Sequence, residues 1–154
     1  MIKHIWSVLC RQSVVDQQSN NVSLISVFEQ LQVDIPPAGL STMSGSKDIN
    51  IPVQYELVNF WSKTKEGEDE KGNIRIVLSD PEGKEIKRID KNLVIPQNNR
   101  RIREINKIQG IALRGSGIYY FIISIKQQGN NIYKQVAELP LEIRINKGKP
   151  VESN

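Results

Sequence analysis

Cysteine and histidine are almost missing from this chain of 154 residues, which contains one of each, Cys10 and His4. A single cysteine excludes an internal disulfide framework and favours a reducing compartment. The four Cys or His ligands of a structural zinc site do not exist here. His4 and Cys10 are six residues apart, or about 20 Å along an extended strand. The spacing predicts that both side chains point to the same face but cannot form a catalytic dyad unless the strand folds back.

Long apolar runs and phosphate-binding motifs are missing as well. No stretch approaches the ~18 apolar residues of a membrane helix, and residues 1–11 lack the small-residue cleavage site of a signal peptide. The sequence therefore predicts a cytoplasmic protein that does not bind a membrane. The Gly115-Ser116-Gly117 segment precedes a strand and lacks the third glycine of a dinucleotide motif, and there is neither a P-loop nor a nucleophile elbow. We expect no catalytic residues, no metal site and no cofactor.

What the chain does have is alternation of apolar and polar residues. Residues 51–61 and residues 139–146 follow a period of two, which predicts strands with one solvent-facing side. Residues 115–125 are a glycine-rich turn followed by β-branched and aromatic residues, and they predict a strand buried on both faces. The Asp-Pro-Glu-Gly sequence at residues 80–83 is a strong turn signal, so the strands on either side of it should pair antiparallel.

Residues 22–33 fit a helix or a strand by their spacing, and their β-branched residues favour one strand. Residues 36–46 are rich in proline, serine and glycine and predict a crossing loop. Eight or nine strands separated by such turns predict an all-β chain, a single-domain antiparallel β-sandwich. We expect this domain to span residues 1–146 and to be followed by a flexible tail at residues 147–154.

Two segments resemble known proteins. Gly117-Ile118-Tyr119 resembles the Gly-x-Tyr segment that opens the penultimate strand of many immunoglobulin-like domains, where the tyrosine hydroxyl binds the preceding corner. This resemblance implies that Tyr119, Phe121, Ile123 and Ile125 face the core between the sheets. The segment from Trp6-Ser7-Val8-Leu9-Cys10 to Val33 resembles an uncharacterised family of small bacterial proteins, which implies an intracellular β-sandwich with no known activity.

Charge is unevenly distributed. The formal net charge is +4, acidic residues outnumber basic ones in residues 1–83, and basic residues dominate afterwards. Such a two-signed molecule can bind an acidic partner or a copy of itself head to tail. The acidic residues within residues 65–72 lie between Lys65 and Lys71 and lack the alternating spacing of a calcium loop, so a solvated loop is favoured over a cation site.

The densest basic cluster is Arg100, Arg101 and Arg103, with Lys84, Lys87 and Arg88 near it in sequence. On a strand, Arg101 and Arg103 project from one face and match the spacing of phosphates or carboxylates. The alternative is that these charges only guard an edge strand against pairing with another molecule. Nucleic-acid surfaces usually add stacking aromatic residues, and none lies within residues 84–114.

Phe60 and Trp61 are adjacent on a predicted strand, so their side chains point to opposite faces and one of them lies outside the core. An exposed aromatic residue of this kind marks an interaction surface. The sequence therefore predicts a non-enzymatic protein-interaction or assembly module with a protein partner or self-association. Its predicted binding residues are Phe60, Trp61, Arg100, Arg101 and Arg103. The alternative is a nucleic-acid or anionic-ligand binder that uses the same arginines.

Overall fold

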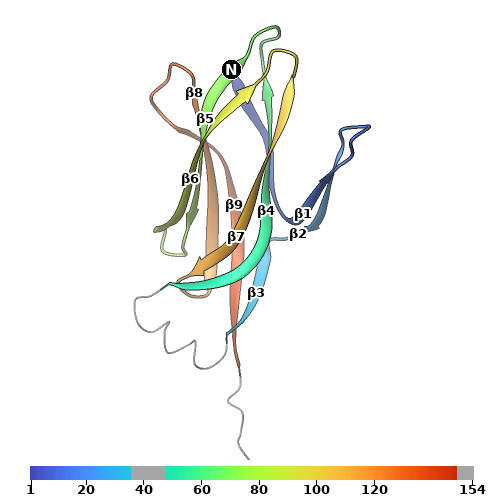
Figure 1. Cartoon of the computed structure of the whole chain (residues 1–154). Coiled ribbons are helices and arrows are strands. Elements are labelled where there is room, and N and C mark those ends of the chain that lie inside the picture. Colours follow the sequence, from blue (N-terminus) through green and yellow to red (C-terminus); the bar gives the residue numbers. More distant parts are fainter. Residues whose placement is uncertain (36–47, 149–154) are drawn as a thin grey trace, which may run out of the picture.

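The computed structural model describes residues 1–35 and 48–148, which form strands and no helix (Figure 1). No segment in these two ranges could cross a membrane as a helix. The expected all-β chain of eight or nine strands is confirmed. Its strands are β1 (Ile2–Val15), β2 (Val22–Val27), β3 (Gln30–Ile35), β4 (Ile49–Lys63), β5 (Glu70–Ser79), β6 (Glu85–Ile95), β7 (Arg101–Leu113), β8 (Gly117–Gln127) and β9 (Lys134–Lys147).

The strands form two sheets (Figure 1). Sheet A has the order β2-β1-β4-β7, and sheet B has the order β3-β9-β8-β5-β6. All neighbouring strands are antiparallel except β3 and β9, which run parallel with Leu31 opposite Ile143. The expectation of a purely antiparallel arrangement is therefore wrong at β3, because this strand joins the edge of sheet B instead of continuing the hairpin of sheet A.

The segment of residues 22–33 is two strands in different sheets, and the prediction of a single strand is wrong. β2 ends at Val27, although Ser26 within it has a φ of +53°. The backbone N–H of Phe28 then donates to the carbonyl oxygen of Leu9 at 3.1 Å, and the chain bends at Glu29 before β3 begins. The predicted crossing loop at residues 36–46 and residues 149–154 of the predicted tail lie outside the described residues.

Both sheets contribute their inner faces to one hydrophobic core. Tyr119, Phe121, Ile123 and Ile125 of β8 are buried in it, as the resemblance to immunoglobulin-like domains implied. The prediction that this strand is buried on both faces is wrong, since Ile118 on its other face is 45 % exposed. β-branched residues stabilise a strand on a half-exposed face too, so a long apolar run does not by itself require two covered faces.

A β-bulge near the start of β1 changes which side chains share a face. His4 lies opposite Trp61 and Trp6 lies opposite Phe60, which leaves Ile5 as the extra residue. His4 therefore faces the core, with its ring 5.1 Å from that of Trp61. Cys10 points to the outer face of sheet A, so the prediction that His4 and Cys10 share a face is wrong.

Candidate functional site

The hairpin of β1 and β2 leaves sheet A on the side opposite to sheet B (Figure 1). β1 pairs with β4 only as far as Cys10, and beyond it pairs with β2 alone, up to Val15. The hairpin is anchored to the outer face of the sheet by Glu56, whose Oε2 accepts from the Ser13 backbone N–H at 2.8 Å and from the Ser13 hydroxyl. Cys10 is fully buried in this region.

The tip of the hairpin is held by Asp16 and by β7. The Asp16 carboxylate accepts from the backbone N–H of Ser19 at 2.6 Å and from its hydroxyl at 2.9 Å, and these hydrogen bonds lower the pKa of Asp16. Asn20 adopts a φ of +57°, which asparagine tolerates better than most residues. Its carbonyl and side-chain oxygens both accept from Nη2 of Arg103 at 2.6 Å. Arg103 thus connects β7 to a tip that is 83 residues away in sequence.

Between the tip and the outer face of sheet A lies a groove of about 590 Å³, which we call the hairpin groove. It is lined by residues of the hairpin, of β4, of β7 and of the turn before β7: Val15, Ser19, Asn20, Asn21, Phe60, Asn99, Arg101, Ile102, Arg103 and Ile105. No acidic residue is among them. Two guanidinium groups in a concave wall without carboxylates create a positive potential that attracts anions.

Three of the predicted binding residues meet in the hairpin groove: Phe60, Arg101 and Arg103. Phe60 packs against Trp6, with ring centroids 5.2 Å apart, so an aromatic pair borders the arginines. Trp61 is fully buried in the core, as expected for one member of the Phe60–Trp61 pair. The contribution of Trp6 and Asn20 was missed, because no local sequence signal connects them with residues 101–103.

The remaining basic residues do not extend this surface. Arg100 forms an ion pair with Glu66. Lys84, Lys87 and Arg88 lie in or next to β6, which belongs to sheet B, whereas Arg101 and Arg103 belong to sheet A. The predicted basic cluster is therefore divided between two sheets and does not form one continuous stripe.

A chain of polar side chains crosses the core from β1 to β6. The Ser7 hydroxyl donates to Oδ1 of Asn59 at 2.5 Å, and Nδ2 of Asn59 donates to Oε2 of Glu104 at 2.7 Å. Nζ of Lys91, from sheet B, donates to the other oxygen of Glu104 at 2.7 Å. His4 Nε2 lies 2.7 Å from the Ser7 hydroxyl oxygen, and burial lowers the pKa of His4. Because the Ser7 proton is directed to Asn59, this arrangement joins the sheets and does not present an activated nucleophile.

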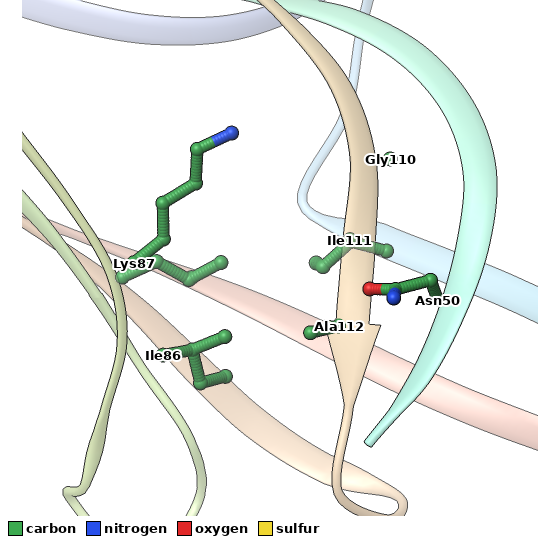
Figure 2. Close-up of a pocket in the computed structure, with 7 residues that line it drawn as sticks. Asn50, Ile86, Lys87, Gly110, Ile111 and Ala112 are labelled. Carbon is green, nitrogen blue, oxygen red and sulfur yellow. The ribbon is translucent and has the colours of Figure 1, made fainter.

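A smaller pocket of about 200 Å³ lies between β6, an edge strand of sheet B, and β7, an edge strand of sheet A (Figure 2). Ile86 and Lys87 from β6 form one wall, and Gly110, Ile111 and Ala112 from β7 form the other. Figure 2 shows the Lys87 side chain extending from β6 into the space between β6 and β7. None of the residues lining this pocket is acidic.

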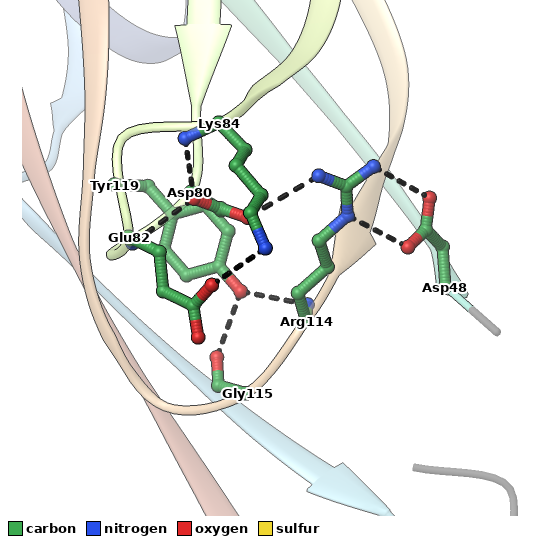
Figure 3. Close-up of polar contacts among 7 residues, drawn as sticks. All are labelled: Asp48, Asp80, Glu82, Lys84, Arg114, Gly115 and Tyr119. Atoms are coloured by element: carbon green, nitrogen blue, oxygen red, sulfur yellow. Dashed lines mark hydrogen bonds and ion pairs between the residues drawn. The ribbon is translucent and has the colours of Figure 1, made fainter. Parts of the chain in front are cut away.

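A network of charged residues connects the ends of the two sheets (Figure 3). Arg114, which follows β7, forms ion pairs with Asp48 at 2.8 Å and with Asp80 at 3.2 Å. The Asp80 side chain is only 3 % exposed. Burial alone would raise the pKa of Asp80, but hydrogen bonds from the Lys84 backbone and from Arg114 outweigh burial and lower it. The network thus fixes the turn after β5 against the end of β7.

The tyrosine corner that the sequence resemblance implied is present next to this network (Figure 3). The Tyr119 hydroxyl accepts from the backbone N–H of Arg114 and donates to the carbonyl oxygen of Gly115, both at 2.8 Å. Tyr119 is itself fully buried. One side chain of β8 therefore satisfies two backbone groups of the turn that precedes it.

Chemically, the hairpin groove is equipped to bind an anion beside an aromatic surface. Within residues 1–35 and 48–148, no three His, Cys, Asp or Glu side chains are grouped so that they could hold a metal ion. The groove residues carry guanidinium, amide, hydroxyl and apolar groups, which bind and orient a ligand by charge, hydrogen bonds and contact area.

No protein-family model matches this chain, and no curated protein is significantly similar to it.

Proposed function

We propose that this chain is a protein-interaction module that binds a short, extended acidic segment of a partner protein in the hairpin groove. The observation that carries the proposal is the meeting of Arg101, Arg103 and Phe60 in one groove that no acidic residue lines. Arginine binds carboxylates through two parallel hydrogen bonds, which gives both charge attraction and orientation.

The other groove residues suit a peptide. Asn20, Asn21 and Asn99 offer amide donors and acceptors that an extended backbone can use, and Phe60 and Val15 offer apolar contact for a side chain. A groove of about 590 Å³ is in the range of pockets that enclose a small ligand or a few residues. The aromatic and arginine residues are also the types that dominate the binding energy at protein interfaces.

A nucleic acid is the second candidate ligand, because arginine beside an aromatic ring also binds phosphate and stacks on a base. Binding to a nucleic-acid strand gains its affinity from several phosphate contacts along a positively charged track. Several other basic residues have acidic partners, as in the pairs Arg100–Glu66, Arg88–Glu85 and Lys84–Glu82. The groove itself is lined by only two basic residues, Arg101 and Arg103, and this favours the acidic peptide.

The proposal includes an immunoglobulin-like β-sandwich as the scaffold. The order β9-β8-β5-β6 in sheet B supports it, because it corresponds to the last, penultimate, third and additional strands of the variable-type sheet. The tyrosine corner at Tyr119 supports it too, since it lies near the start of the penultimate strand. Such scaffolds present binding loops and hairpins on a rigid core.

The experiment is a selection of peptides from a random phage library on the immobilised protein, with the Arg101→Ala, Arg103→Ala double variant for counter-selection. We expect the enriched peptides to contain Asp or Glu residues beside an apolar one. Fluorescence anisotropy of a selected peptide should show that the double variant weakens binding at least about tenfold, because two charge-assisted contacts are lost.

Arg144→Ala is the matched control, because Arg144 forms an exposed pair with Glu142 on sheet B and lies outside the hairpin groove. Peptide binding that lacks an acidic preference, or that the double variant leaves unchanged, would refute the proposal. A labelled oligothymidylate serves as the second probe. If this probe binds more tightly than the best peptide, and the double variant loses this binding, the ligand of the groove is a nucleic acid and not a peptide.

A further inference from the structure

The pocket between β6 and β7 exists because two β-bulges face each other. In sheet B, Leu78 lies opposite Lys87 and Ser79 lies opposite Glu85, so Ile86 is an extra residue and both Ile86 and Lys87 line the pocket. In sheet A, β4 has an extra residue between Ile51 and Gln54, opposite Gly110. Bulges redirect side chains and are common beside binding sites.

Gly110 lies in the wall that β7 contributes. Its φ is +78°, which only glycine adopts without strain, and a Cβ atom there would lie 3.3 Å from the Ile51 carbonyl oxygen. The neighbouring residue on this wall, Ala112, is also small. The two walls therefore leave a space of about 200 Å³ (Figure 2). An apolar cavity of about 150 Å³ is large enough to bind benzene, so a ligand with one compact apolar group fits here.

The pocket is lined by one basic residue and by no acidic residue. Lys87 is its only charged lining residue, and Lys87 forms no ion pair with any residue that the structure describes. By contrast, Lys84 and Lys91 have acidic partners at 2.9 Å and 2.7 Å. A single unpaired ammonium beside Ile86, Ile111 and Leu78 complements a ligand that carries one negative charge on an apolar body.

An unused hydrogen-bond donor lies in the adjoining pocket. Tyr55, Lys87 and Leu78 line this second, smaller pocket, so the two pockets share a wall. Tyr55 is 3 % exposed, and its hydroxyl has no hydrogen-bond partner among the described residues. A buried hydroxyl without a partner is destabilising, and a bound acceptor would satisfy it.

We infer that the pocket between β6 and β7 is a second binding site, for a small monocarboxylic acid with a branched or aromatic body. Lys87 binds the carboxylate, and Leu78, Ile86 and Ile111 contact the apolar group. The single positive charge excludes dianions as preferred ligands, because a second negative charge would lose its hydration without gaining a partner. The site is independent of the hairpin groove, which lies on the outer face of sheet A.

The experiment is a titration of the ¹⁵N-labelled full chain with phenylacetate, followed by amide chemical shifts. We expect saturable shifts at residues 86–87 and 110–112, and these shifts should persist in the Arg101→Ala, Arg103→Ala double variant because the two sites are separate. Phenylacetamide and phenethylamine, which have the same ring without the negative charge, should bind at least about tenfold more weakly.

Two variants separate the charge from the cavity. Lys87→Met keeps the stem and removes the ammonium, and Ala112→Leu fills the space between the walls. Each should weaken phenylacetate binding at least about tenfold, while the dispersed spectrum shows that the chain is folded. Lys107→Met, on the opposite face of β7, is the control and should bind as the unaltered chain does. No saturable shift with phenylacetate, equal binding of phenethylamine, or an unchanged affinity of Lys87→Met would overturn the inference.

Discussion

At the scale of single residues, Tyr119 shows how a local motif predicts a tertiary contact. The resemblance of this segment to the Gly-x-Tyr segment of immunoglobulin-like domains implied that its hydroxyl binds the preceding corner, and the hydroxyl contacts the backbone of both Arg114 and Gly115. This contact is local, since the residues involved are four and five positions apart. Local geometry of this kind is encoded in a few neighbouring residues, so a short motif is enough to show the resemblance.

Replacing Tyr119 by Phe should lower the free energy of unfolding by about 1–3 kcal/mol, because the backbone N–H of Arg114 then loses its acceptor. Urea unfolding followed by circular dichroism measures the change. Tyr120→Phe is the control: its side chain is on the other, half-exposed face of β8, and the change should stay within about 0.5 kcal/mol. Equal effects of the two substitutions would contradict the role of the tyrosine corner.

At the scale of elements, the periodicity of two located the strands well, but it did not reveal their bulges. The alternation in residues 51–61 and 139–146 is that of β4 and β9. The bulge at Ile5 and the bend at Glu29 leave no comparable signal, because an extra residue or a change of sheet depends on the pairing of the whole strand. The faces of His4 and Cys10, and the partner of β3, therefore could not be derived from periodicity.

The β1–β2 hairpin offers a test at this scale, because Cys10 is buried on the outer face where the hairpin leaves the sheet. Burial, and to a lesser degree the charge of Glu56, raises the pKa of the Cys10 thiol. Glu56→Ala removes the carboxylate that anchors Ser13. We expect Cys10 to react with a disulfide reagent about tenfold faster or more, because the hairpin opens more often.

Repeating the reaction at a pH where the thiol is ionised in both proteins separates access from the change in pKa. Glu85→Ala on β6 is the control and should leave the rate as it is. If Glu56→Ala does not accelerate the reaction at high pH, the carboxylate does not hold the hairpin closed.

At the scale of the whole molecule, Arg114 connects the two sheets by binding Asp48 before β4 and Asp80 after β5. Both aspartates have a lowered pKa. The side-chain hydrogen bond from Arg114 is the main cause for Asp48, and for Asp80 the hydrogen bonds outweigh the effect of burial. A carboxylate with a lowered folded-state pKa stabilises the protein above its unfolded-state pKa, and this stabilisation is lost as the pH falls through the folded-state value.

Arg114→Ala should therefore be most destabilising above about pH 5, where both aspartates are ionised in the folded and unfolded chains. The difference from the unaltered chain should decrease as the pH falls below the ordinary value of 3.8, because protonated aspartates no longer need the guanidinium. Urea unfolding at a series of pH values measures this. Arg144→Ala, which breaks the exposed pair with Glu142, should show a small effect at every pH.

The residues of the hairpin groove were predicted in part from the sequence, but their arrangement is a property of the tertiary structure. Arg101, Arg103 and Phe60 were predicted individually, from a basic cluster and from the opposed faces of two adjacent aromatic residues. Their meeting in one groove was not predictable, since Phe60 joins the arginines through the pairing of β4 with β7 and Asn20 joins them through the hairpin. The position of Lys87 in the pocket between β6 and β7 likewise depends on the pairing of distant strands, with bulges in both sheets.

The sequence by itself determined that this is an all-β chain and where most of its strands lie. These properties follow from alternation and turn chemistry, which act between residues close together in the chain. Only the tertiary structure decided the parallel pairing of β3 with β9, the face of Cys10, the hairpin groove and the pocket at Lys87. These depend on register, bulges and contacts between distant segments, because a shift of one residue exchanges the faces of a strand and no local pattern fixes that shift.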